Sequence, residues 1–419
     1  MSTHTTTRRT VLTGIAATSL AASSPKSALA NSTVSQSKSR SWDAIVVGAG
    51  VFGVWTAHHL QQAGKKVLLV DGNGPANARA SSGGETRMIR SDYGTDAIYT
   101  KMSNASLVEW KKLSQQAELP LFHQTGVLFF FQQMVDYARS SIETHKELKL
   151  PLEVLDARAL KKGFPQFDFS GVEFGLYEVG FGALMARRAV QHLVSNFVKS
   201  GGTFRQALAS APNADGHSLQ IGNRREITDH IIYACGPWMR TLLPKILEEK
   251  LFVTRQEVAF VAPPSGSTDF GFGSLPGWAD YNDGDLYYGF PDIEGRGFKI
   301  AHDKHGEAFD PEYGDRQTTK ESLDRLQTYM TRRFPSLANA PFIGDRVCQY
   351  SNSSNGDFLI DRHPEFENII LLGAGSGHGF KHGPEVGRMA AMLAQDTTLK
   401  PVERFSLATK ATHHKRTVL

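Results

Sequence analysis

Cysteine is nearly absent from this chain, with two residues in 419. A disulfide framework of the kind that holds small secreted domains together is therefore excluded, and each thiol needs its own explanation. Long apolar runs are missing too, because no stretch approaches the roughly 18 consecutive apolar residues of a membrane-spanning helix. We therefore expect a soluble protein with no membrane span.

A strong excess of positive charge is also missing. The net charge is +4, and three of the cations, Arg8, Arg9 and Lys26, lie in residues 1–30, which contain no Asp or Glu and whose removal leaves +1. This balance gives no sign of a nucleic-acid partner. The arginine pair, a short apolar run and small residues ending at Ala30 predict a twin-arginine export signal and a periplasmic or secreted protein. A disordered basic tail is the alternative.

A dinucleotide-binding pattern follows this segment. Asp43–Val47 predicts a buried strand, Val54–Ala63 a helix, Lys66–Val70 a second strand, and Asp71 ends it. Glycines between the first strand and the helix allow a tight turn, bring backbone N–H groups to a pyrophosphate and let the helix pack closely, while the acid is placed to bind ribose hydroxyls. The glycines are Gly48, Gly50 and Gly53.

The segment Ala78–Gly94 favours FAD over NAD as the dinucleotide. Its first half is rich in hydroxyl groups and glycine, and its second half contains Arg87 and Arg90, whose spacing on a predicted helical turn puts both guanidinium groups on one side. A surface arginine pair at a helix start is the alternative. The other residues that we assign to this cofactor-facing segment are Ser81, Ser82, Gly83, Gly84 and Thr86.

These features, with two later segments, resemble the D-amino-acid oxidase/glycine oxidase superfamily of flavoproteins, and within it the monomeric sarcosine oxidases and N-methyltryptophan oxidases. The resemblance runs from about Asp43 to about Gln395. It implies a mixed α/β (α+β) fold in which a Rossmann-like FAD-binding domain joins a discontinuous antiparallel-sheet substrate domain. The segments that carry it are VVGAGVFG…LLVD, SSGGETRMIRSDYG, LYYGFPDIEGRGFKIAH and RVCQY…GSGHGFKHGP.

Domain boundaries follow from the same resemblance. We expect a signal peptide, a linker, a flavin domain in three pieces, a substrate domain in two pieces and a peripheral tail. In that order the boundaries are 1–30; 31–41; 42–95, 150–235 and 340–396; 96–149 and 236–339; and 397–419.

Cys348 matches the family cysteine that carries FAD covalently, through sulfur to the flavin 8α carbon. Two alternatives stay open, namely a disulfide with Cys235 and an inert buried thiol. Tyr350 lies two residues further on and faces the same way in an extended segment. In the family it lines the substrate cavity, as does the tyrosine matched by Tyr288, for which ordinary sheet packing is the alternative.

The resemblance also assigns a set of cations. Lys299 matches a lysine on the flavin face opposite the substrate, where a cation stabilises the charge that develops on O2; a solvated strand lysine is the alternative. Arg90 and Lys381 match the pair that binds the substrate carboxylate, and Arg87 matches an arginine close to the flavin ring. A structural salt bridge is the alternative for Arg90. Backbone N–H groups of the turn that contains Gly377 and Gly379 would meet the flavin pyrimidine edge.

The chain departs from the family pattern at three places. Gly83 stands where the family has a histidine, and Asp303 follows His302 where the family has a histidine beside the substrate amine. An acid there favours a protonated or more basic substrate. Ala279 suggests a roomier pocket.

The expected activity is oxidation of an N-methyl or other secondary α-amino acid to an imine, with O2 reduced to H2O2, by a monomer that needs no metal. An exported dehydrogenase that passes electrons to a quinone or cytochrome is the main alternative. A non-catalytic flavin-binding protein is less consistent with the full set of cations.

Overall fold

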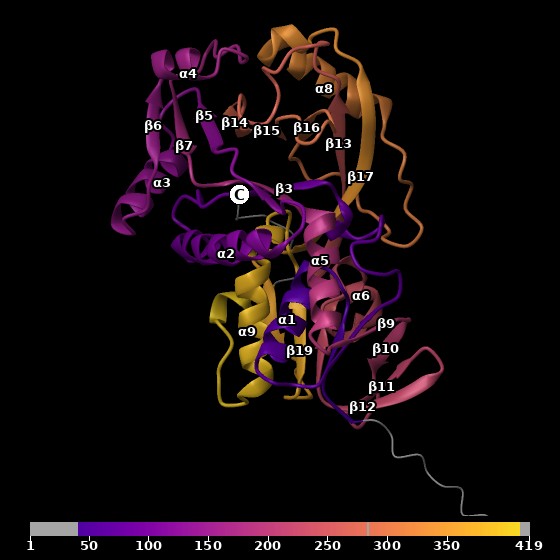
Figure 1. Ribbon diagram of the computed structural model, residues 1–419. Coiled ribbons are helices and arrows are strands. Elements are labelled where there is room, and N and C mark those ends of the chain that lie inside the picture. Colours follow the sequence, from indigo (N-terminus) through magenta and orange to yellow (C-terminus); the bar gives the residue numbers. More distant parts are fainter. Residues whose placement is uncertain (1–40, 283–284, 411–419) are drawn as a thin grey trace, which may run out of the picture. The chain divides into compact units, whose positions relative to one another are not determined.

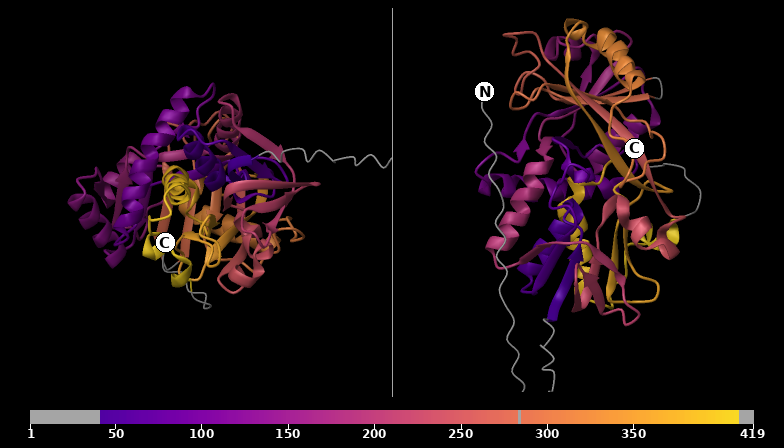
Figure 2. Two further views of the ribbon diagram at one scale, coloured as in Figure 1. Left: turned by 90° about the horizontal axis from the view of Figure 1, so that it is seen from below. Right: turned by 90° about the vertical axis from the view of Figure 1, so that its right-hand side faces the viewer.

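The computed structural model describes residues 41–282 and 285–410. The predicted export signal and nearly all of the predicted linker lie outside these residues, so both stay predictions. The described residues belong to one compact unit. Figure 1 shows two large sheets, one above the other, with strand β3 (Thr86–Ile89) and helix α2 (Ala97–Gln116) between them. The right-hand view of Figure 2 shows the same order from the side.

The first large sheet contains the predicted dinucleotide strands at its centre. β1 is hydrogen-bonded in parallel to β2 and to β12, and β12 is parallel to β19. Successive side chains of β1 face opposite ways, so that Ala44 and Val46 pack in one core and Ile45 and Val47 in another. The strands are β10 (Ala209–Pro212), β11 (Ser218–Ile221), β12 (Arg224–Tyr233), β1 (Ser41–Val47), β2 (Val67–Asp71), β9 (Thr203–Gln206), β19 (Ile369–Gly373) and β18 (Leu359–Arg362).

Helices cover both faces of this sheet. α1 packs against α5 and α9 on one face, while α6 and α7 lie over the core on the other. α1 begins three residues earlier than predicted, directly after Gly50, so Gly53 lies in its first turn. The helices are α1 (Val51–Gln62), α5 (Ala186–Lys199), α6 (Met239–Leu242), α7 (Pro244–Leu247) and α9 (Gly383–Gln395).

The second large sheet is antiparallel except where β14 and β5 run in parallel. Its outer face packs against α8 (Lys320–Arg333) through Trp278, Phe298 and Met330, and Figure 1 shows α8 above it. Its inner face contributes Phe129 and Ala279 to the cavity described below. The strands, in sheet order, are β17 (Phe342–Ser353), β13 (Leu251–Val261), β16 (Phe298–His302), β15 (Asp285–Phe290), β14 (Gly277–Asn282), β5 (Val127–Phe131), β7 (Phe174–Glu178) and β6 (Glu153–Asp156).

The predicted mixed α/β fold is confirmed. The second sheet also includes β6, β7 and β17, which lie in segments that we assigned to the flavin domain, and the domain boundaries themselves stay a prediction. No helix within the described ranges is both long and apolar enough to cross a bilayer. The remaining elements are β3 (Thr86–Ile89), β4 (Phe122–His123) and β8 (Gly182–Met185), which form a small sheet, and helices α2 (Ala97–Gln116), α3 (Asp136–Glu147), α4 (Ala157–Gly163) and α8 (Lys320–Arg333).

Candidate active site

Two of the three glycines at the turn between β1 and α1 leave no room for a side chain. A Cβ on Gly48, whose φ is +107°, would lie 2.4 Å from the carbonyl oxygen of Ala234, and a Cβ on Gly53 would lie 1.8 Å from that of Gly48. A Cβ on Gly50 would meet only Ser82 Oγ, at an ordinary 3.5 Å. Gly50 is therefore the position where space is kept for a ligand rather than for the protein itself.

Asp71 ends β2 beside this turn. Its carboxylate accepts hydrogen bonds from the N–H groups of Ala49 at 2.8 Å and Asn73 at 2.9 Å. Burial raises its pKa, and these hydrogen bonds oppose the rise. The contact to Ala49 ties the acid to the glycine turn, in a cavity that both of them line.

Three adjoining cavities extend from Asp71 to Lys381. We number them from the Asp71 end, so that the first cavity contains Asp71 and the third contains Lys381. The first and second cavities share Gly50, Ser81 and Ser82, and the second and third share the wall residues given at the end of this paragraph. An elongated space that begins at a glycine turn and a helix N-terminus fits FAD, because the diphosphate can lie at α1 and the ring system can reach the third cavity. The shared walls of the second and third cavities are Arg87, Cys348, Tyr350, Gly377 and Phe380. Gly379 lines the second.

Ser81 and Ser82 hold the loop between the turn and β3. Ser82 Oγ accepts the N–H of Val51 at 3.1 Å, and Ser81 Oγ donates to the carbonyl of Gln349 at 2.9 Å. Gly83 packs so tightly that a Cβ would lie 2.0 Å from the carbonyl oxygen of Asn77. This contact explains why the histidine of the family pattern has no place here.

The predicted helical turn at Arg87 and Arg90 is wrong. Thr86–Ile89 form strand β3, which pairs with β8 from a distant part of the sequence. Hydrogen bonds to β8 satisfy the backbone N–H and C=O groups of this segment, and this pairing outweighs the local preference for a helical turn. Both arginines still line the same cavity, since Arg90 comes directly after the strand ends.

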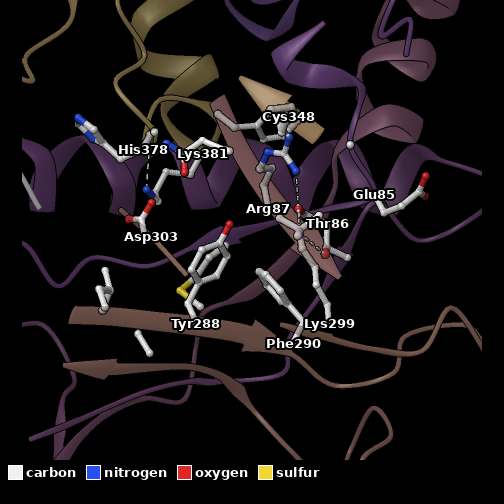
Figure 3. Close-up of a pocket in the computed structure, with 18 of the residues that line it drawn as sticks. Glu85, Thr86, Arg87, Tyr288, Phe290, Lys299, Asp303, Cys348, His378 and Lys381 are labelled. Carbon is white, nitrogen blue, oxygen red and sulfur yellow. Dashed lines mark hydrogen bonds between the residues drawn. The ribbon is translucent and has the colours of Figure 1, made fainter. Parts of the chain in front are cut away.

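Thr86 anchors two of the predicted cations in the wall of the third cavity. Its carbonyl accepts hydrogen bonds from Arg87 Nη1 at 2.8 Å and from Lys299 Nζ at 3.0 Å. Figure 3 shows the bonds from Lys299 to Thr86, with Phe290 alongside. Burial, and then the charge of Arg87, lowers the pKa of Lys299 to about 7. Lys299 is 3% exposed, so the solvated-lysine alternative does not hold.

The two cysteines have different surroundings. Cys348, on β17, lines the junction of the second and third cavities, and Arg87 Nη2 donates to its sulfur at 3.5 Å. Cys235 donates to the carbonyl of Val47 at 3.3 Å, and burial followed by the charge of Asp71 raises its pKa to about 12. Both thiols are free, so the disulfide alternative is not formed in this structure.

The two predicted carboxylate-binding cations meet at Tyr93. Lys381 Nζ donates to the Tyr93 hydroxyl at 2.8 Å and to the carbonyl of His378 at 2.9 Å. The guanidinium of Arg90 lies over the Tyr93 ring, 4.2 Å from its centre. The same hydroxyl is 2.8 Å from His382 Nε2. Burial and the charge of Lys381 lower the pKa of His382 well below its usual value, which makes the ring neutral.

Sequence reasoning missed Tyr93, His378 and His382 as parts of this cluster. The available signal was their place in two of the quoted segments, SDYG and SGHGFKHG. Their contact could not be predicted, because it joins residues nearly 290 positions apart, as Tyr93 and Lys381 are.

The structure places Tyr288 and Tyr350 in the wall of the third cavity. Cys348 and Tyr350 lie on the same face of β17, and Tyr288 lies opposite Ala279 in the β14–β15 pair. Burial, and then the charge of Asp303, raises the pKa of Tyr288.

The described residues contain no group of acids, histidines and cysteines arranged to hold a metal ion.

Comparison with known proteins agrees with this geometry. The family model described as DAO, FAD dependent oxidoreductase, matches residues 43–393. The chain is 30% identical to the peroxisomal sarcosine oxidase of Mus musculus over 387 residues, covering 88% of this chain and 98% of that protein. It is 28% identical to the N-methyl-L-tryptophan oxidase of Salmonella arizonae over 366 residues, covering 85% and 95%.

Solved structures show the same fold. The L-proline dehydrogenase from P.horikoshii superposes with a TM-score of 0.77 at 20% identity, covering 88% of this chain and 97% of that one. NikD, an amino acid oxidase of nikkomycin biosynthesis, does so with a TM-score of 0.73 at 21% identity, covering 87% and 97%. Since the family model spans most of the chain and the cavities fit its cofactor, the chain belongs to the DAO family and is an FAD-dependent oxidoreductase.

Proposed function

We propose that this protein oxidises the C–N bond of an N-methyl or other secondary α-amino acid to an imine and reduces O2 to H2O2. The observation that carries the proposal is that Arg90 and Lys381, which both contact Tyr93, line the same cavity as the buried Lys299. The names of relatives that cover most of the chain, sarcosine oxidase and N-methyl-L-tryptophan oxidase, support this substrate class.

The chain's residues supply binding and electrostatics for this reaction. FAD, when bound, accepts the two electrons and the hydrogen that leave the substrate carbon. Arg90 and Lys381 bind the carboxylate and so fix the orientation of the reacting carbon. Tyr288 and Tyr350 exclude water and offer aromatic faces to an amine. The imine then leaves and hydrolyses.

In this proposal, Lys299 assists the reaction with O2. Its ammonium group, held by Thr86, stabilises negative charge as oxygen is reduced. If the protein is instead a dehydrogenase, a quinone or cytochrome accepts the electrons. Lys299→Met then hardly changes the turnover rate, whether the acceptor is an artificial one or the physiological one. An oxidase loses most of its peroxide formation in this variant.

Attachment of FAD to Cys348 is a separate part of the proposal. The position of this sulfur between the second and third cavities, beside Arg87, supports a thioether at the flavin 8α carbon. That bond replaces the thiol hydrogen and one methyl hydrogen, and O2 accepts the two electrons released. Periplasmic export and a monomeric state complete the proposal, on the basis of the sequence alone.

Two measurements test the function. The purified protein is mixed anaerobically with N-methylglycine, N-methyltryptophan and proline, and loss of the yellow flavin absorbance is followed; in air, peroxide is assayed. Bleaching together with peroxide is the expected result. A protein bleached by none of the secondary amino acids tried would refute the substrate class and leave the fold and cofactor intact.

Acid precipitation tests the thioether. We expect the yellow colour to stay with the precipitated protein in the wild type and to move to the supernatant in Cys348→Ser. Free flavin released from the wild type would show that Cys348 has another role.

A further inference from the structure

The charges that line the third cavity are strongly unequal. Among the described residues on its wall, only Glu85 and Asp303 are acidic, whereas five side chains are cationic. Glu85 forms an ion pair with Arg296, outside the cavity, and Figure 3 shows it at the opposite side of the view from Asp303. The cations are Arg87, Arg90, Lys299, Arg346 and Lys381. Asp303, unlike Glu85, has a hydrogen-bond partner, Tyr350, that itself lines the cavity.

Asp303 is held in a defined place. Its N–H donates to the carbonyl of Leu286 at 2.7 Å, which joins it to β15, and its Oδ1 accepts a hydrogen bond from the Tyr350 hydroxyl at 3.1 Å. Its charge also acts on Tyr288, the other tyrosine of the wall. The neighbouring His302 stacks on Tyr287 with ring centres 4.5 Å apart and is not among the residues that line the cavity.

A cavity with this charge pattern complements a zwitterion. Arg90 and Lys381 lie beside Tyr93 and supply cations for a carboxylate, and Asp303 supplies a carboxylate for an ammonium group. Hydrogen bonds between charged partners in a partly dehydrated site are the strong ones. The aromatic rings of Tyr288 and Tyr350, beside Asp303, add a surface that also attracts a cation.

We propose that Asp303 binds the cationic amino group of the substrate, so that the protein selects amino acids that enter with a protonated nitrogen. This inference rests on the proposed function and names the group that recognises the amine. The bound ammonium group first gives one proton to solvent, because only the neutral nitrogen has a free electron pair. That pair forms the C=N bond when the neighbouring carbon loses a hydrogen together with two electrons, for which FAD is the acceptor.

The test compares each amino acid with the acid in which CH2 replaces its NH2+ group. N-methylglycine is paired with butyrate, and proline with cyclopentanecarboxylate. Dissociation constants are measured anaerobically by calorimetry and by perturbation of the flavin spectrum in the wild-type holoenzyme, Asp303→Asn, Asp303→Glu and Glu85→Gln, each reduced beforehand with dithionite. With the flavin already reduced, a bound amino acid is not oxidised and the heat reports binding alone; bleaching of the oxidised holoenzyme is followed separately.

We expect the wild type to bind the amino acid more tightly than its isostere. Asp303→Asn should lose this preference by about 10- to 100-fold while the isostere binds as before or more tightly, since a hydrogen-bonded charge pair has been removed. Asp303→Glu should recover part of the preference. Glu85→Gln removes the other acid of the same cavity and should leave the preference unchanged.

Three results would overturn the inference. They are a wild type without preference for the amino acid, an Asp303→Asn variant that weakens both ligands equally, and a Glu85→Gln variant with the same effect as Asp303→Asn. Failure of the proposed function gives a different result, namely a flavin that stays oxidised although the preference for the amino acid is present and depends on Asp303.

Discussion

Lys299 shows how burial sets the chemistry of a single residue. Its pKa is lowered to about 7 by burial and by Arg87, so the cation is present below pH 7 and is lost as the pH rises. We predict that the rate constant for reaction of the reduced enzyme with O2 falls as the pH rises through this pKa, or through a higher one set by the charge of the reduced flavin. Stopped-flow reoxidation between pH 6 and 9.5 measures it.

Lys299→Met is the control for this pH dependence. It should react slowly at every pH and show no titration. The same pH-dependent decline in the variant would show that another group titrates.

Tyr93 is the residue through which Lys381 and Arg90 are positioned. We predict that Tyr93→Phe raises the KM for the amino acid about 10-fold, since it removes a hydrogen bond to a charged group, and changes kcat less. Tyr99→Phe is the matched control, because its hydroxyl donates to Asp357 at 2.7 Å rather than to Lys381. Steady-state kinetics at fixed flavin content decide; equal effects in both variants would contradict the positioning role.

At the scale of elements, the β1–α1 turn separates folding from cofactor binding. Gly53→Ala forces a methyl group onto the carbonyl of Gly48, whereas Gly50→Ala meets only Ser82 Oγ. We predict that Gly53→Ala is insoluble or unfolded. In a Cys348→Ser background, which cannot form the proposed thioether, Gly50→Ala should keep its circular dichroism and bind FAD about 10- to 100-fold more weakly, since phosphate–backbone hydrogen bonds are lost. An unchanged FAD affinity of Gly50→Ala in that background would contradict this separation.

The strand β3 is the element at which local sequence misled us. The spacing of Arg87 and Arg90 suits a helical turn, but Thr86–Ile89 pair with Gly182–Met185. A segment of four residues gains few hydrogen bonds as an isolated turn, so the partner strand decides its conformation.

At the scale of the whole molecule, the cavities join the two large sheets. Their walls come from β1, β2 and α1 at one end and from β13 to β17 at the other. We predict that FAD stabilises both layers together in Cys348→Ser, which cannot form the proposed thioether. Stabilisation should reach about 2.7 kcal/mol at 100-fold excess over Kd.

Thermal unfolding and hydrogen exchange measure this linkage. Tm should rise with the logarithm of the FAD concentration, and peptides from β1–α1 and from β17 should gain protection in parallel. Protection confined to the first sheet would show that the two layers respond independently.

Much of the dinucleotide site follows from sequence alone. Strand, glycine turn, helix, second strand and Asp71 are consecutive, so short-range hydrogen bonding and the space required at Gly48 and Gly53 specify the arrangement locally. The family resemblance added the cations and tyrosines, and the structure brings them to one cavity.

The tertiary structure alone decided the substrate end of the site. Tyr93 meets Lys381, Tyr350 meets Asp303, and Lys299 meets Thr86, each pair joined across elements that are remote in the chain. Such contacts depend on how two sheets pack, and the same packing removes water from Lys299 and shifts its pKa. The periodicity of the sequence carries no information on these contacts or on this pKa shift, because both depend on the distances between strands and not on the order of the strands in the chain.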